Sequence, residues 1–194
     1  MKNKSTRREF LELNAALLTS TTFAASGVSL VHAASRRDKY RVFSKGRIAS
    51  LTLKNRLVRS ATAEGASPKG QMNKDGLTMY EHLAAGGVGM IITGHMVAVR
   101  GGDAHENQTH IDDDRYISTL REIADVVHHN GADCKLIAQL SHAGPNGMVD
   151  PIAASEMPGR PNGKKPRTLS ITEISDLIAQ YSAAVRQGSI RKTP

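Results

Sequence analysis

The sequence predicts an α/β protein with a parallel sheet. Strand-like and helix-like segments alternate three times between residues 56 and 185. The segment Val88–Thr93 is a continuous apolar run, which is typical of a strand buried on both faces of a parallel sheet. Strand–helix–strand units of this kind connect in a right-handed sense. With 194 residues, 39% of them hydrophobic and 23% charged, the chain can form a core without cross-links.

The first 33 residues are predicted to be a signal peptide. Four basic residues precede the uncharged, weakly apolar stretch Leu13–Val31, which ends in the small-x-small sequence Val31–Ala33, the layout of a secretory signal. The segment Ser5–Glu12 resembles a twin-arginine motif. We therefore expect the protein to be periplasmic or exported. The alternative is a cytoplasmic protein that keeps the segment as an uncleaved leader helix. Seven Ser, Thr and Gly residues interrupt the stretch and argue against a stable membrane anchor.

The net charge of +8 does not predict a nucleic-acid partner. The leader holds four of the 26 basic and two of the 18 acidic residues, so the rest keeps +6. These charges are dispersed, and four Tyr and three Phe offer few rings for base stacking. A solvated basic surface is the preferred interpretation. The single cysteine excludes an internal disulfide and a multi-thiolate metal site, and the histidines lack metal-ligand spacing, so no metal is expected.

The mature chain is predicted to begin with a small hairpin. Tyr40–Phe43 and Leu51–Leu53 are short strand-like runs joined through Lys45-Gly46. The segment Arg56–Ala61 follows as a plausible first strand of the sheet, and a loop rich in Gly, Ser and Pro comes after it.

Two helices and two further strands are expected next. The first helix covers about Asp75–Ala85 and ends at Gly86-Gly87, because glycine favours helix C-termini. The strand Val88–Thr93 leads through a polar loop to Asp112–Asp114, whose carboxylates can cap a second helix. That helix ends at Asn130-Gly131, and Lys135–Leu140 is the third strand.

The last helix has the clearest start in the sequence. Ser170 and Glu173 form a capping box, and Leu169 and Ile174 are spaced for a hydrophobic staple. The preceding segment Ser141–Arg167 is long enough for a functional loop. The predicted buried face of the helix consists of Ile171, Ile174, Leu177, Ile178 and Tyr181.

Four strings in this order carry a specific resemblance. They are LTLKNRLVRSATAEG (Leu51–Gly65), YEHLAAGGVGMIITG (Tyr80–Gly94), LIAQLSHAG (Leu136–Gly144) and SITEISDLIAQYSAAV (Ser170–Val185). Together they resemble the old yellow enzyme family, in its NADH:flavin oxidoreductase branch. The resemblance implies a partial TIM (β/α)8 barrel, with about three βα units preceded by a hairpin. Sites in such barrels lie at the C-terminal ends of the strands.

The resemblance also implies an FMN site on these strands. The segment Ser60-Ala61-Thr62-Ala63 matches the turn that lies against the flavin ring. Gly94 and His95 match a second contact at the end of the next strand. Gln139 matches a glutamine at the pyrimidine edge of the flavin, where an amide can both donate and accept. A tight turn and a buried structural glutamine are the alternatives. His142 is expected to orient its loop and not to act on substrate.

The implied reaction passes a hydride from NADH or NADPH through FMN to an electron-poor alkene. No catalytic residue is assigned, because the family's substrate-binding histidine pair is expected beyond residue 194. We divide the chain into a signal peptide (1–33), the N-terminal part of an FMN-binding barrel (34–185) and a cationic tail (186–194) that is typical of a frameshift or early stop. The alternatives are an inactive barrel fragment and an exported interaction module without flavin. Open sheet edges predict self-association or aggregation.

Overall fold

The computed structural model describes residues 39–159 and 163–189. The predicted signal peptide and the end of the cationic tail lie outside these residues. The strands and α-helices discussed below all lie in one compact unit, which begins at Val42. No helix in the described part of the chain combines the length and apolarity needed to cross a bilayer.

The central sheet has three parallel strands in the order β3-β4-β5. They are β3 (Val58–Arg59), β4 (Met90–Val97) and β5 (Lys135–Ser141). The parallel arrangement confirms the predicted βαβ connections. β3 is shorter than predicted, and β4 runs four residues past Thr93 because a register shift between Ile92 and His95 lets the pairing with β5 continue.

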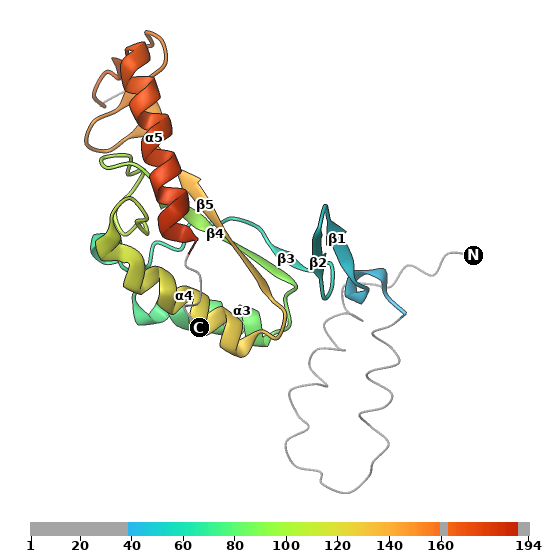
Figure 1. Ribbon diagram of the computed structural model, residues 1–194. Helices are drawn as coiled ribbons and strands as arrows, with labels where there is room; N and C mark the ends of the chain where they lie inside the picture. The colour runs from blue at the N-terminus through green and yellow to red at the C-terminus, as the bar shows by residue number, and fades with distance from the viewer. Residues whose placement is uncertain (1–38, 160–162, 190–194) are drawn as a thin grey trace, which may run out of the picture. The chain divides into compact units, whose positions relative to one another are not determined.

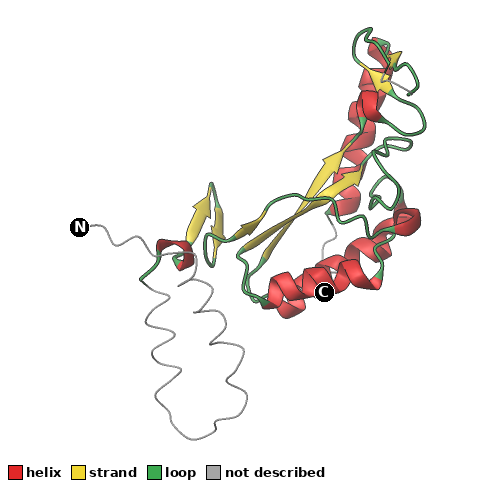
Figure 2. Cartoon of the chain, turned by 180° about the vertical axis from the view of Figure 1, so that it is seen from behind, coloured by secondary structure: helices red, strands yellow, loops and turns green. Residues whose placement is uncertain are grey.

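Helices α3 (Lys74–Ala85) and α4 (Ile117–Asn130) pack against each other along the same side of the strands (Figures 1 and 2). Asn73 caps α3 by accepting a hydrogen bond from the Gly76 amide. Gly87, with φ of 90°, provides the left-handed residue that follows the helix. The helices enclose a core with β4 that includes Met72, Tyr80, Ala84, Ile91, Met96, Leu120, Ile123 and Val127.

The N-terminal hairpin forms, but with a different first strand. β1 (Gly46–Ile48) pairs antiparallel with β2 (Leu51–Leu53), and the register places Ile48 opposite Leu51. The turn is therefore Ala49-Ser50, with Ala49 at a φ of 49°. The predicted strand Tyr40–Phe43 was wrong, because Arg41–Phe43 forms a short 3-10 helix (η1) instead.

The predicted loop Ser141–Arg167 contains some regular structure. A short 3-10 helix, η4 (Gly144–Asn146), follows β5. Two two-residue strands, β6 (Ile152–Ala153) and β7 (Arg167–Thr168), pair in parallel. The amides of Arg167 and Leu169 donate to the carbonyls of Pro151 and Ala153, so the middle of the loop is joined to its end before the last helix starts. Two further 3-10 turns, η2 (Pro68–Gly70) and η3 (Asp114–Tyr116), precede α3 and α4.

Helix α5 (Ile171–Gly188) begins at the predicted capping box and ends three residues after Val185. The prediction of its buried face was wrong for Ile171 and Ile178, whose exposed fractions are 84% and 64%. Leu177 and Tyr181 do pack against the core, and Ala184 is buried. Ile174 is half-buried, so the predicted face is buried only in part, and the core contacts of α5 come from Leu177 onwards.

Candidate functional site

The residues predicted to form one site meet at the C-terminal edge of the sheet. Ser60–Ala63 directly follow β3, while Gly94 and His95 lie near the end of β4. Gln139 lies near the end of β5, and His95 is its Cα partner in the parallel register. Residues paired in this way point to the same face of a sheet. Three segments far apart in sequence are thereby brought together.

Gln139 combines a fixed backbone with an available side chain. Its amide nitrogen donates to Thr93 Oγ1 over 3.1 Å, and that hydroxyl donates to the Gly94 carbonyl over 2.8 Å. The residue itself is exposed. Within the described residues its side-chain amide makes no hydrogen bond, so the amide is available to a ligand.

The segment after β3 presents small residues at the surface. Ser60, Thr62 and Ala63 are exposed, and Ala61 is half-buried. The side chain of Arg59 attaches this segment to β4. Its Nη1 donates to the Ile92 carbonyl at 2.8 Å and its Nη2 donates to the Thr62 carbonyl at 3.0 Å. The Arg59 guanidinium therefore joins the loop after β3 to β4.

Glu64 is the centre of a buried polar cluster at the same edge. Its Oε1 accepts hydrogen bonds from the Gly94 amide at 2.8 Å and the Tyr80 hydroxyl at 2.5 Å, and it lies 3.2 Å from Arg59 Nη2. The side chains of Arg59 and Glu64 are only 13% and 7% exposed. Burial and the hydrogen bond to Glu64 raise the pKa of Tyr80 far above its usual value, so Tyr80 stays a neutral donor. We call these four residues the Glu64 cluster.

His95 belongs to a second cluster with a single consistent arrangement of protons. Gln108 Oε1 accepts from the Ala104 amide, so its Nε2 faces His95 and donates to the His95 carbonyl at 2.8 Å and Nδ1 at 3.0 Å. The Nε2 atom of His95 then carries the proton and donates to His105 Nε2 at 3.3 Å. Burial, and then the nearby His105, lower the pKa of His95. His95 is therefore neutral and oriented.

Two further histidines hold loops at this edge, His110 in the loop after β4 and His142 in the loop after β5. His110 lies between the carboxylates of Asp103 and Asp112, at 2.8 and 2.9 Å. His142 Nδ1 accepts from the Gly144 amide at 2.8 Å, in agreement with its expected role in orienting a loop, and burial lowers its pKa. In the part of the chain that the structure describes, no three His, Cys, Asp or Glu side chains are grouped to hold a metal ion.

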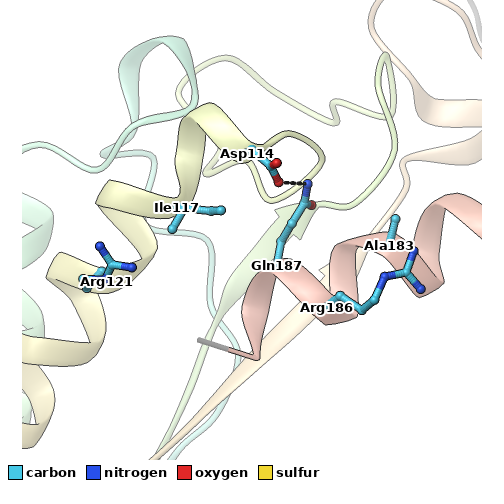
Figure 3. Close-up of a pocket in the computed structure, with 6 residues that line it drawn as sticks. All are labelled: Asp114, Ile117, Arg121, Ala183, Arg186 and Gln187. Carbon is cyan, nitrogen blue, oxygen red and sulfur yellow. Dashed lines mark hydrogen bonds between the residues drawn. The ribbon is translucent and has the colours of Figure 1, made fainter. Parts of the chain in front are cut away.

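A pocket of about 440 Å³ lies elsewhere, between α4 and α5 (Figure 3). Arg121 and Arg186 line it, and Gln187 Nε2 donates to Asp114 Oδ1 over 3.0 Å across it. None of the predicted site residues contributes to this pocket, and we do not take it as the functional site.

Sequence reasoning missed the residues that hold the edge together. Arg59, Glu64 and Tyr80 are spread over a strand, a loop and a helix, so no local spacing connects them. Only the composition offers a signal, because Glu64 is the single acidic residue between β3 and α3. Gln108 and His105 lie in a polar loop without the hydrophobic period of a helix or a strand, so its conformation could not be predicted from the sequence.

Comparison with known proteins identifies the relatives of this chain. The sequence profile of the NADH:flavin oxidoreductase / NADH oxidase family matches residues 42–189. A metal reductase of Desulforamulus reducens is 32% identical over 151 residues, and an NADH oxidase of Thermoanaerobacter brockii is 36% identical over 154 residues. Each alignment covers 75% of this chain but only 22% and 23% of the relative. The chain thus spans about a quarter of their length.

Solved structures show the same fold. A 2-naphthoyl-CoA reductase complex superposes with a TM-score of 0.71 at 17% identity, covering 76% of this chain and 25% of that one. Morphinone reductase in complex with tetrahydroNAD gives 0.69 at 19% identity, covering 76% and 46%. The old yellow enzyme homologue of Zymomonas mobilis gives 0.64 at 22% identity, covering 76% and 45%. The described fold is accordingly part of a TIM barrel, as predicted.

Proposed function

The chain belongs to the NADH:flavin oxidoreductase / NADH oxidase family, and on that premise we propose that its three βα units carry the flavin-ring side of an FMN-dependent oxidoreductase site. The observation that supports this most directly is the pairing of His95 with Gln139 at the C-terminal edge of the sheet, next to Ser60–Ala63. Binding sites in TIM barrels occupy this edge.

The residues at the edge fit the ring of FMN. The ring is flat and needs close approach on one side, and the exposed segment Ser60–Ala63 offers small side chains there. The pyrimidine end of the ring alternates donors and acceptors, and the exposed amide of Gln139 supplies both kinds of group. His95 is held neutral, so it adds no charge beside the ring.

When bound, FMN supplies two-electron hydride transfer between a nicotinamide and an acceptor. The chain's own contribution is to bind and orient the ring: Gln139 by hydrogen bonds, Ser60–Ala63 by close packing, and Gly94 and His95 by bounding the end of β4. We propose NADH or NADPH as the donor and an electron-poor alkene as the acceptor. Similar proteins include a metal reductase and a 2-naphthoyl-CoA reductase, so the acceptor is tested directly below.

Flavin titration tests the proposal. The purified chain is titrated into FMN, and the quenching of flavin fluorescence gives Kd. Gln139→Ala should raise Kd about tenfold, because one or two hydrogen bonds worth about 1.4 kcal/mol are lost. Gln180→Ala removes an exposed glutamine on α5 and serves as the matched control, with Kd unchanged.

Three results would contradict the proposal. A folded wild-type chain that leaves FMN fluorescence unaltered does not bind the ring, which would favour an interaction module without flavin. Equal Kd values for wild type and Gln139→Ala would remove Gln139 from the site. If the FMN-loaded chain binds the ring but does not oxidise NADH or NADPH in the presence of 2-cyclohexenone, the described chain is a binding fragment and the hydride-transfer part of the proposal fails.

A further inference from the structure

We infer that Glu64 is the positioning residue of the proposed flavin site. Its carboxylate connects the loop after β3 to β4, and so sets the backbone of Ser60–Ala63 relative to Gly94 and His95. The inference rests on the proposed function for its consequence in flavin binding. The connection itself rests on the contacts of the Glu64 cluster alone.

The geometry gives Glu64 three donors from three different elements. The Gly94 amide belongs to β4, the Tyr80 hydroxyl to α3 and the Arg59 guanidinium to β3, and all three converge on Oε1. A carboxylate accepts several hydrogen bonds at once and makes strong ones when ionised. No neutral side chain of similar size can replace all of these interactions.

Gly94 provides independent support for this role. A Cβ atom added to Gly94 would collide with Glu64 Oε2 and would lie 2.8 Å from the Thr62 carbonyl oxygen. The absence of a side chain at position 94 therefore makes room for the loop after β3 and for the Glu64 carboxylate. The resemblance assigned Gly94 to the flavin contact; in the structure its glycine identity is explained by contact with Glu64.

Arg59 extends the connection to the exposed segment. The same guanidinium that lies beside Glu64 donates to the carbonyls of Ile92 and Thr62. Losing the Glu64 carboxylate would leave Arg59 as an uncompensated, nearly buried charge, which would be expected to turn towards solvent. Thr62 and its neighbours would then lose their attachment to β4.

Hydrogen exchange and flavin affinity, measured on the same variants, test the inference. In Glu64→Ala we expect the Gly94 amide, followed by NMR in flavin-free protein, to exchange at least tenfold faster than in wild type, and Kd for FMN to rise at least tenfold. Glu64→Gln keeps an acceptor but not the charge and should give intermediate values for both. Glu81→Gln removes an exposed carboxylate of α3 and should change neither.

A general loss of stability is separated by a further control. Ile123→Ala weakens the core on α4 but should leave the FMN Kd and the visible spectrum of bound flavin as in wild type. In Glu64→Gln that spectrum should shift, because the ring lies on a displaced segment.

The outcomes are distinct. Unchanged exchange at Gly94 in Glu64→Ala would overturn the inference. Faster exchange with unchanged Kd and spectrum would show a structural contact without a positioning role, and would also overturn it. A wild-type chain that does not bind FMN would overturn the proposed function, while the exchange at Gly94 would still decide whether Glu64 joins the loop to β4.

Discussion

The imidazole Nδ1 of His110 lies 2.9 Å from Oδ1 of Asp112, and its Nε2 lies 2.8 Å from Oδ1 of Asp103. Both ring nitrogens therefore face acceptors, which only the protonated ring can satisfy by donating twice. Burial by itself lowers the pKa of His110, but the hydrogen bonds and charges of Asp112 and Asp103 outweigh it and raise the pKa above its usual value. The loop after β4 is held by a charged histidine.

Stability should consequently depend on pH through His110. Because its pKa is raised in the folded state, the contribution is complete below the unfolded value of about 6.5 and is lost as pH rises through the folded pKa. His110→Gln should cost about 2 kcal/mol near pH 5.5, and less at alkaline pH. Urea denaturation of both proteins across this range measures the difference. His82→Gln, at an exposed position on α3, is the control; a His110→Gln cost independent of pH would contradict the assignment.

His95 should titrate in the opposite sense. Its pKa is lowered by burial and then by His105, so stability falls as pH drops through the unfolded value of about 6.5. Replacing His105 by Ala removes the second cause, and the pKa of His95 should rise part of the way to its usual value. NMR titration of the His95 ring protons measures this. An unchanged His95 pKa in His105→Ala would show that the two rings do not interact.

Position 94 should tolerate only glycine. Gly94→Ala places a Cβ against the Thr62 carbonyl and the Glu64 carboxylate, and overpacking of this kind costs about 1–3 kcal/mol. Gly46→Ala is the control, because its Cβ would meet no atom closer than 3.5 Å. Chemical denaturation of both variants is the measurement. Equal stability of Gly94→Ala and Gly46→Ala would mean that the loop after β3 is not packed against β4.

Riboflavin and FMN should bind this chain with similar affinity. All seven residues proposed for the site are assigned to the ring and none to the phosphate, so removing the phosphate should change Kd by less than about threefold, or ~0.7 kcal/mol. Parallel fluorescence titrations of the two flavins give the ratio. A preference for FMN of a hundredfold would indicate a phosphate contact on the chain that we have not assigned.

Ile178 on α5 and Ile123 on α4 should respond differently to truncation of their side chains. Ile178 is 64% exposed, and Ile178→Ala should change the free energy of unfolding by no more than about 0.5 kcal/mol. Ile123 lies in the core and is 1% exposed, so Ile123→Ala should lower the free energy of unfolding by about 2–5 kcal/mol. A large effect at Ile178 would show that another surface, from a second copy or another protein, covers this helix.

The sequence was sufficient for the parts of the fold that local patterns determine. The capping box at Ser170, the glycine stop after α3 and the apolar run of β4 each depend on neighbouring residues, and the structure confirms them. The meeting of Gln139 and His95 also followed, because the C-terminal ends of adjacent parallel strands share one edge.

Other features depend on partners distant in sequence and could not be predicted. The first strand of the hairpin was predicted at Tyr40–Phe43 and lies at Gly46–Ile48, because both segments are short and local sequence does not distinguish which one pairs with Leu51–Leu53. The helical period of α5 predicts an apolar face but not whether another element covers it. The proposed role of Glu64 required knowing that two strands and a helix converge on one of its oxygen atoms.

The partners of Glu64 lie close together along the chain, from Arg59 to Gly94. During synthesis, which proceeds from the N-terminus, the whole cluster is available before β5 and Gln139 have left the ribosome. Short sequence separation also keeps the entropy of loop closure low. The connection between the loop after β3 and β4 can therefore form before β5 joins the sheet.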